Sequence, residues 1–355
     1  MKKLLSLTLA SLLAISMLAG CAQTPTDDSA SSTGGSNSPS EASSEDLSQD
    51  TGNTMTFVNG EKELPTKFDN FAVFDYSLID QFVSLGAVPK YGSFLVQNEK
   101  GSVDIAYGWE RVFENHDLSG SVPMSTRSET YLEELLVANP DFIVITESQE
   151  RFLDKYEAIA PTYIFPSVFE ISEGSSIWKE EFKFVAQFLG ETAQSEEMLN
   201  TFDELVASSR EKVGAEIDGK TALVMQLNEK GFKLRMPDQY PAVYADMGFI
   251  APENLNEDYS SQDYRNESGS FPVETIAEFN PDFIFIQVQS EETYNSIKDT
   301  PFWKSVTAVQ EDRVYGITQT GWNHLNGYTA NTMKINDIVY FITENKQIIP
   351  NLPLE

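Results

Sequence analysis

LEELLVANPDFIVI (residues 132–145) and VETIAEFNPDFIFI (residues 273–286) decide the fold of this chain. The two stretches align without a gap at an offset of 141 residues. Each has the pattern of a helix, an Asn-Pro-Asp turn and a buried strand. Repetition of one structural unit predicts two lobes of related topology, with the repeated strand at corresponding positions of their sheets.

Other short apolar runs indicate further strands of the same kind. They cover residues 71–74, 221–226, 283–287 and 314–317. A continuous apolar run without alternation is typical of a parallel strand that is buried on both faces. The first run leads through Asp75, Tyr76 and Ser77 into apolar residues at helical spacing, which is a β-loop-α pattern. Strands that alternate with helices predict an α/β fold with parallel sheets.

A long helix is predicted between the two repeats. Residues 176–217 contain no proline and place apolar side chains at helical spacing. Gly190 marks a break, after which residues 192–217 can form one helix. We expect this helix to bridge an N-terminal lobe (residues 55–191) and a C-terminal lobe (residues 218–355). Because a helix is a stiff connector, the lobes should rock slightly rather than close about a large hinge.

Residues 1–21 have the form of a lipoprotein export signal. Lys2 and Lys3 precede an apolar stretch through Met17, and small residues then lead to Cys21. The apolar stretch is too short to remain as a membrane-spanning helix. We therefore expect a lipid on Cys21 that holds the mature protein on the extracellular face of the cell membrane. Cys21 is the single cysteine, which excludes an intrachain disulfide bond.

Residues 22–54 contain almost no large apolar side chain, so burial cannot offset the entropy lost on ordering them. We expect a disordered linker whose reach as a flexible coil is on the order of 30 Å. A polar tether of this length suits a Gram-positive cell surface. The formal charge of −31 argues against nucleic acid and anionic headgroups as partners, because both would be repelled.

The body of the chain resembles the solute-binding lipoproteins of ABC importers for ferric siderophores, haem and vitamin B12. The resemblance covers residues 68–340 and rests on the two repeats together with FDYSLIDQFVSLGAVPKYG, ERFLDKYEAIAPTYIF, FKFVAQFLGE, VYADMGFIAPE and PFWKSVTAVQEDRVYGI. It implies two Rossmann-like lobes joined by a single long helix, with a ligand cleft between them. The branch it resembles most binds catecholate and mixed-ligand siderophores such as petrobactin.

The resemblance also bears on the charge of the ligand. That branch holds an anionic ferric complex with arginines, and the matching positions of this chain carry Ser148, Gln239 and Gln289. A metal-ligand position of the family has become Asn323, which is followed by His324. Such a cleft would leave a trianionic complex poorly neutralised. The comparison therefore implies a neutral or cationic ligand, and a ferric hydroxamate siderophore is the preferred candidate.

Aromatic faces and neutral hydrogen-bond donors would recognise such a ligand, with cation–π contacts if it carries an ammonium group. Lys90 matches a position that is basic in the petrobactin branch. A ligand with some negative charge therefore remains an alternative. His324 has a second possible role as a metal or haem ligand. We expect no cofactor besides the bound iron chelate. The expected ligand-binding residues are Tyr76, Lys90, Tyr91, Trp109, Arg127, Ser148, Gln239, Tyr240, Gln289, Trp322, Asn323 and His324, and core packing is the alternative role of the aromatic ones.

Glu133 and Glu274 occupy equivalent positions near the starts of the two repeated helices. In the family that the chain resembles, glutamates at these positions dock into basic pockets of the ABC permease dimer, which its ATPase subunits drive. The alternative is an acidic residue that merely stabilises the start of its helix.

The expected class is a monomeric binding protein rather than an enzyme. The sequence contains no nucleophile motif, no phosphate-binding loop and no set of metal ligands. A catecholate siderophore, haem or a corrinoid is the alternative ligand, and a cell-surface hydrolase is the alternative class.

Overall fold

The computed structural model describes residues 53–92, 94–97, 103–105, 109, 113, 120–124, 131–167, 169, 175–255, 270–317, 321–322 and 326–344. The predicted export signal, Cys21 and almost all of the predicted linker lie outside the described residues. No helix in the described part of the chain is long and apolar enough to cross a membrane.

The N-terminal lobe is built on a sheet whose strands pair in parallel in the order β7-β4-β3-β8-β9. An antiparallel hairpin, β1–β2, joins the β9 edge, where the Val58 N–H donates to the Ile164 carbonyl at 3.0 Å. The elements are β1 (Thr54–Phe57), β2 (Gly60–Glu63), β3 (Phe71–Val73), α1 (Tyr76–Ser84), β4 (Tyr91–Gly92), β5 (Leu95–Gln97), β6 (Val103–Ile105), β7 (Val122–Pro123), α3 (Tyr131–Ala138), β8 (Phe142–Thr146), η1 (Glu147–Phe152), α4 (Leu153–Glu157), β9 (Thr162–Phe165) and α5 (Ile177–Leu189).

The C-terminal lobe has a sheet in the order β11-β10-β12-β13. Its elements are β10 (Ala222–Asn228), β11 (Gly231–Leu234), η2 (Pro237–Gln239), η3 (Ala242–Asp246), η5 (Val273–Thr275), α8 (Ile276–Phe279), β12 (Phe283–Val288), α9 (Glu291–Ile297), α10 (Pro301–Lys304), α11 (Thr307–Gln310), β13 (Val314–Gly316) and α12 (Tyr328–Glu344). The predicted parallel pairing is confirmed for β10, β12 and β13.

Strand β11 was not predicted, and it runs antiparallel to β10. The hairpin between them requires a glycine at residue 231. Gly231 has a φ of +133°, and a Cβ atom there would lie 2.0 Å from the Phe271 carbonyl oxygen. The edge of the sheet is therefore antiparallel, although its centre is parallel as the sequence predicted.

The two lobes carry the predicted repeat at the same place. β8 lies between β3 and β9, and β12 lies between β10 and β13. The turns before these strands also match, because Asn139 and Asn280 both adopt positive φ, at 47° and 38°. Asparagine tolerates this left-handed conformation better than most residues. The related topology of the two lobes is confirmed.

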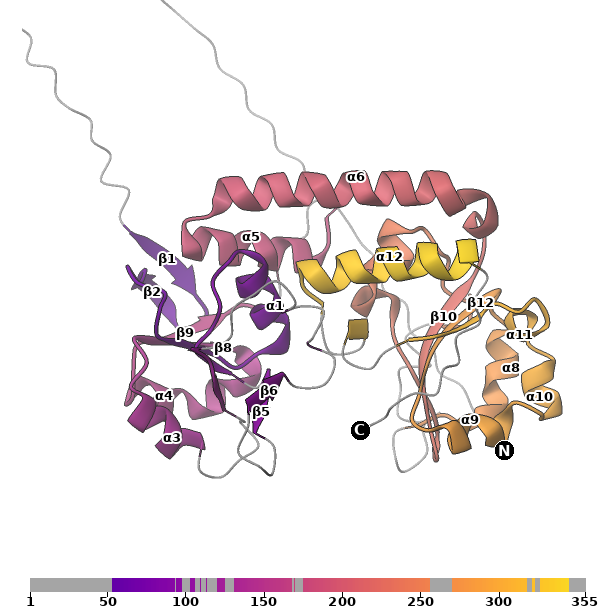
Figure 1. Ribbon diagram of the computed structural model, residues 1–355, viewed down its shortest axis with the longest axis horizontal. Helices are drawn as coiled ribbons and strands as arrows, with labels where there is room; N and C mark the ends of the chain where they lie inside the picture. Colours follow the sequence, from indigo (N-terminus) through magenta and orange to yellow (C-terminus); the bar gives the residue numbers. More distant parts are fainter. Residues whose placement is uncertain are drawn as a thin grey trace, which may run out of the picture. The chain divides into compact units, whose positions relative to one another are not determined.

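Helix α6 (Thr192–Ile217) has the predicted bounds and connects the two lobes. Helix α5 ends before it at Gly190, which caps the helix in the left-handed conformation at φ 77°. α6 packs on α5 and on α12, as Figure 1 shows. The connector is thus supported by a helix from each lobe.

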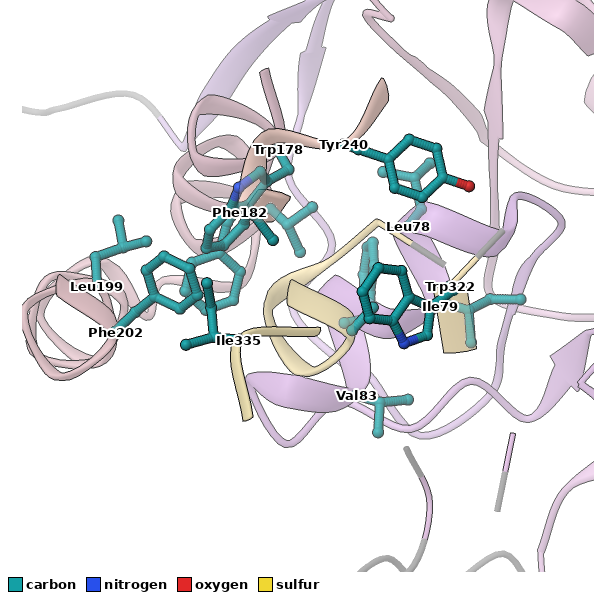
Figure 2. Close-up of a cluster of buried hydrophobic side chains, with 14 of the residues drawn as sticks. Leu78, Ile79, Val83, Trp178, Phe182, Leu199, Phe202, Tyr240, Trp322 and Ile335 are labelled. Atoms are coloured by element: carbon teal, nitrogen blue, oxygen red, sulfur yellow. The ribbon is translucent and has the colours of Figure 1, made fainter. Parts of the chain in front are cut away.

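Helix α12 was not assigned from the sequence, and it ties the two lobes together a second time. It contacts α1 and α5 of the N-terminal lobe as well as α6 and η3. Figure 2 shows the apolar cluster at this junction, with Trp178 from α5, Phe202 from α6 and Ile335 from α12. One buried core therefore runs through both lobes.

Candidate functional site

The candidate site is built from the carboxyl ends of the two sheets. Successive residues of a strand point to opposite faces of the sheet. In β8, Phe142 and Val144 belong to the core cluster shared with α6, and Thr146 continues the same face where the strand ends. Ligands of open parallel sheets bind at these ends. The candidate site therefore lies where this face turns from apolar to polar.

In the N-terminal lobe this position is occupied by Asp75, Thr146 and Ser148, here called the N-lobe edge. The Thr146 hydroxyl donates to Asp75 Oδ2 at 3.3 Å and lies 2.9 Å from Ser148 Oγ. Asp75 Oδ1 accepts the Ser77 N–H at 3.0 Å and so caps α1. The edge is acidic and rich in hydroxyl groups, and its carboxylate is held by the start of a helix.

Glu181 of α5 lies behind the N-lobe edge. Its carboxyl group accepts hydrogen bonds from the Ser77 hydroxyl and the Gln81 amide, each at 3.2 Å. Burial, together with the nearby charges of Asp75 and Asp80, raises the pKa of Glu181 to about 8. Glu181 therefore holds its proton to a higher pH than a solvent-exposed glutamate does.

In the C-terminal lobe the corresponding face ends in two amides. Val224 and Phe285 lie in the same core cluster as β8, and Gln226 and Gln287 continue their face toward the carboxyl ends of β10 and β12. The register places these two glutamines side by side. The C-terminal sheet thus becomes polar at the same end as the N-terminal sheet.

Two cations complete this face. Lys233 pairs with Gln226 across the hairpin, and Arg235 follows two residues later with its N–H bonded to the Val224 carbonyl at 3.0 Å. Leu234 packs against the core on the opposite face, so Lys233 and Arg235 point to the side of Gln226. We call Gln226, Gln287, Lys233 and Arg235 the C-lobe edge.

The Arg235 guanidinium is held by an amide rather than by a carboxylate. Its Nη2 donates to Gln226 Oε1 at 3.3 Å. Its Nε is buried and has no hydrogen-bond partner among the described residues. Burial raises the pKa of the Tyr240 hydroxyl above its usual value, and the nearby positive charge of Arg235 opposes this shift.

Lys334 of α12 lies beneath Tyr240, with Nζ 5.4 Å from the centre of the ring. The lysine is fully buried, and burial lowers the pKa of Lys334 to about 7, although the charge of Asp80 opposes this effect. Asn326 Oδ1 accepts a hydrogen bond from Nζ at 3.5 Å. Lys334 supports Tyr240 from inside the protein and is not open to a ligand.

Asp80 of α1 caps the start of α12 across the junction of the lobes. Its Oδ1 accepts the Thr329 N–H at 3.2 Å and its Oδ2 accepts the Ala330 N–H at 3.0 Å. Burial raises the pKa of Asp80 above the usual value, and these hydrogen bonds oppose that shift. Gly327 lies so close that a Cβ atom there would meet the carboxylate at 2.5 Å. The contact fixes α12 to the N-terminal lobe.

A pocket of about 430 Å³ opens beside Phe68 and Asp69, at the amino end of β3, whereas the polar edges follow the carboxyl ends of the strands. Phe68, Leu85, Leu189 and Glu191 are among the residues that line it. Its position relative to β3 argues against a role in binding at the carboxyl ends. In the described part of the chain, no group of three or more His, Cys, Asp or Glu side chains could hold a metal ion.

Comparison with known proteins agrees with this architecture. The sequence model of the periplasmic binding proteins matches residues 102–320, which is more than half of the chain. The chain is a member of the periplasmic binding protein family. Members of this family bind solutes and are not enzymes.

Two relatives from Bacillus subtilis (strain 168) are similar to this periplasmic binding protein. The iron-uptake system-binding protein is 27% identical over 202 residues, which cover 54% of this chain and 60% of that protein. The iron(3+)-hydroxamate-binding protein FhuD is 26% identical over 220 residues, which cover 61% and 66%. The match therefore spans less than two thirds of the length of either relative.

Solved structures share the fold. Staphylococcus aureus SirA complexed with staphyloferrin B is 20% identical, with a TM-score of 0.62 over 82% of this chain and 98% of SirA. Bacillus subtilis FeuA, a triscatecholate siderophore binding protein complexed with ferri-bacillibactin, is 18% identical, with a TM-score of 0.60 and the same coverage. At this level of identity the likeness concerns the fold.

The aromatic residues predicted to contact a ligand are mostly buried in the binding protein. Tyr91 donates its hydroxyl to the Ala138 carbonyl at 3.3 Å and packs in the N-lobe core. Trp109 and Trp322 are 2% and 1% exposed, and Tyr240 is equally buried. Trp322 donates to Asp337 at 3.0 Å. Their alternative role in core packing accounts for this burial, and their contact with a ligand stays a prediction.

The remaining predicted residues fall into two groups. Ser148, Gln239 and Gln289 are exposed, whereas Tyr76 and Lys90 are half-buried. Tyr76 packs against the Trp109 ring at 5.7 Å, and Lys90 Nζ lies 5.6 Å from the centre of the Tyr91 ring. Of the predicted set, Arg127, Asn323 and His324 lie outside the described residues.

The cationic residues of the C-lobe edge were not predicted from the sequence. Gln239 stands at the arginine position of the similar family, and Arg235 stands four residues earlier. Recognition of β11 would have revealed it, because Phe232 and Leu234 alternate with Lys233 and Arg235 in the pattern of a half-buried strand. The short hairpin was overlooked, and its polar face with it.

Proposed function

We propose that this periplasmic binding protein captures a ferric siderophore at the N-lobe and C-lobe edges and delivers it to an ABC permease. The observation that carries the proposal is the pair of polar edges at equivalent ends of two repeated sheets. Membership of the family and the printed functions of the Bacillus subtilis relatives support it. The protein would act as a monomeric carrier without catalytic activity.

The preferred ligand is a neutral or cationic ferric hydroxamate. Ser148, Gln239 and Gln289 are exposed and uncharged, so they offer hydrogen bonds without neutralising a trianion. The N-lobe edge is acidic and would repel an anionic chelate while attracting an ammonium group. A relative that binds an iron(3+)-hydroxamate supports the same choice.

The body of the protein, residues 53–355, should bind ferrioxamine B at least about tenfold more tightly than ferric enterobactin or haem. The first chelate is a cationic hydroxamate, and the second is a trianionic catecholate. Quenching of tryptophan fluorescence measures each affinity, with iron-free desferrioxamine B as the control. Tighter binding of ferric enterobactin would overturn the ligand class, and tighter binding of haem would assign the haem alternative.

We further propose that Cys21 carries the lipid anchor and that Glu133 and Glu274 dock on the two halves of the permease. Both glutamates are exposed, on α3 and on η5. Their equivalent positions in the repeat suit a partner with two similar halves.

Reversing both charges, with Glu133→Lys and Glu274→Lys, should abolish iron uptake and leave ligand affinity within about twofold. Two lysines would face basic groups of the permease, and like charges in contact repel. Uptake of radioactive iron by cells that carry only the variant measures the effect. The matched control is Glu204→Lys with Glu211→Lys on the exposed face of α6, which should transport normally. Normal uptake by the docking variant would refute the assignment.

A further inference from the structure

We infer that Arg235 and Lys233 form an anion-binding site at the C-lobe edge and bind a negatively charged oxygen group of the chelate. The inference rests on the proposed function and deepens it, because it assigns an orientation to the ligand. The oxygen-rich side of the chelate faces the C-terminal sheet, and any ammonium group faces the N-lobe edge.

The backbone holds both cations in place. Arg235 follows directly on β11, and its N–H bond to Val224 extends the pairing of β10 with β11 by one residue. Lys233 lies opposite Gln226 in the same register. Because both residues belong to or adjoin a paired strand, their side chains start from fixed points on one face. A site on a paired strand is positioned more precisely than a site on a loop.

Arg235 has hydrogen-bonding capacity that the protein does not use. Neither Arg235 nor Lys233 forms an ion pair with any described carboxylate, although the chain contains 55 acidic residues and 24 basic ones. The buried Nε of Arg235 has no partner among the described residues. A buried donor without a partner costs free energy, and a guanidinium binds carboxylate-like oxygens through two parallel donors. An oxygen anion would satisfy Nε together with a terminal nitrogen.

The surroundings favour an anion at this edge and disfavour one at the other. Beside Arg235 lies the uncharged amide of Gln226, whose Oε1 accepts a hydrogen bond from Arg235 Nη2 at 3.3 Å. At the N-lobe edge, by contrast, Asp75 is a carboxylate and its neighbours Thr146 and Ser148 are hydroxyls. Gln239 stands where the similar family has an arginine, and Arg235 supplies the positive charge of that arginine instead. Two cations suit one anionic group or the iron-bound oxygens of a neutral chelate, and they fall short of neutralising a trianion.

The test compares single and double variants of the two cations in the protein body. Arg235→Gln should weaken binding of ferrioxamine B about 10- to 100-fold, as expected when a charged hydrogen bond is lost. Arg235→Lys should restore part of the affinity because it keeps the charge. Lys212→Gln on the exposed face of α6 makes the same change in net charge and should have no effect. Circular dichroism confirms that each variant is folded.

Two chelates distinguish the sources of the anionic oxygen. The only anionic oxygens of ferrioxamine B are hydroxamate oxygens bound to iron, whereas ferric citrate also offers free carboxylates. If Arg235→Gln loses affinity for both chelates equally, Arg235 binds the iron-bound oxygens. A loss confined to ferric citrate would assign a carboxylate. Either result supports the anion site, and a shallower dependence of affinity on salt in the variant would accompany it.

The results that contradict the inference are separate from those that contradict the proposed function. If the unaltered protein binds ferrioxamine B or ferric citrate, but the double variant Lys233→Gln, Arg235→Gln binds it equally well, the anion site is wrong and the carrier function stands. If the unaltered protein binds no ferric chelate of any charge, the carrier function fails and the anion site fails with it.

Discussion

Replacement of Asp80 by alanine should lower the free energy of unfolding by about 3–5 kcal/mol, the range for breaking a buried charged network by removing one member. The substitution leaves the N–H groups of Thr329 and Ala330 without their acceptor at the start of α12. It also removes the carboxylate whose charge favours the protonated form of the buried Lys334. Urea denaturation followed by circular dichroism measures the loss.

Two further variants make this prediction specific. Asp80→Asn keeps an acceptor oxygen and should lose less than Asp80→Ala. Asp299→Ala removes an exposed carboxylate that pairs with Lys304 at 2.9 Å, and solvent screening leaves a surface pair of this kind with little effect on stability. A loss in Asp80→Ala no larger than that in Asp299→Ala would show that the cap of α12 is dispensable.

Glu181→Gln should make the protein more stable at pH 9 by about 5 kcal/mol and have little effect at pH 4.5. The pKa of Glu181 is raised from 4.5 to about 8 in the folded protein. Between these values the folded state keeps a proton that the unfolded state has released. The contribution of Glu181 to the stability of the unaltered protein therefore falls as the pH rises from 4.5 to about 8. The variant has no such loss, because glutamine is neutral at every pH.

The difference between variant and unaltered protein isolates this effect from that of Lys334. The pKa of Lys334 is lowered from 10.5 to about 7, so its contribution to stability rises with pH between those values. That contribution is common to both proteins and cancels. Thermal unfolding from pH 4.5 to pH 9 measures the difference. Glu196→Gln, on the exposed face of α6, is the control, and a variant whose stability tracks it at every pH would disprove the assignment.

The repeat and the connector could be predicted from sequence because both depend on local patterns. Each Asn-Pro-Asp turn breaks a helix and precedes an apolar run, and the central strands formed there as predicted. Helix α6 has the predicted bounds because Gly190 gives a sharp break and no later residue interrupts the helix before Asp218. These signals need no knowledge of distant contacts.

The site was harder to predict because its groups come together only in the folded protein. A hairpin brings Arg235 beside Gln226, and Asp80 contacts Ala330, which lies 250 positions away in the sequence. The aromatic residues predicted to bind the ligand could equally pack in a core or line a cleft. Residue type alone does not distinguish these two roles. Tyr91, Trp109 and Trp322 are buried in the structure, as a role in the core requires, and their contact with a ligand stays a prediction.

The contact of α12 with α1 has a consequence for the order in which the protein is made. Among the described elements, α1 is the first helix to leave the ribosome and α12 is the last, yet Asp80 and Gln81 of the one bind the opening N–H groups of the other. The N-terminal lobe cannot bury Asp80 in its final surroundings until synthesis has passed residue 330. Completion of this junction is therefore delayed until residues 328–330 have been made.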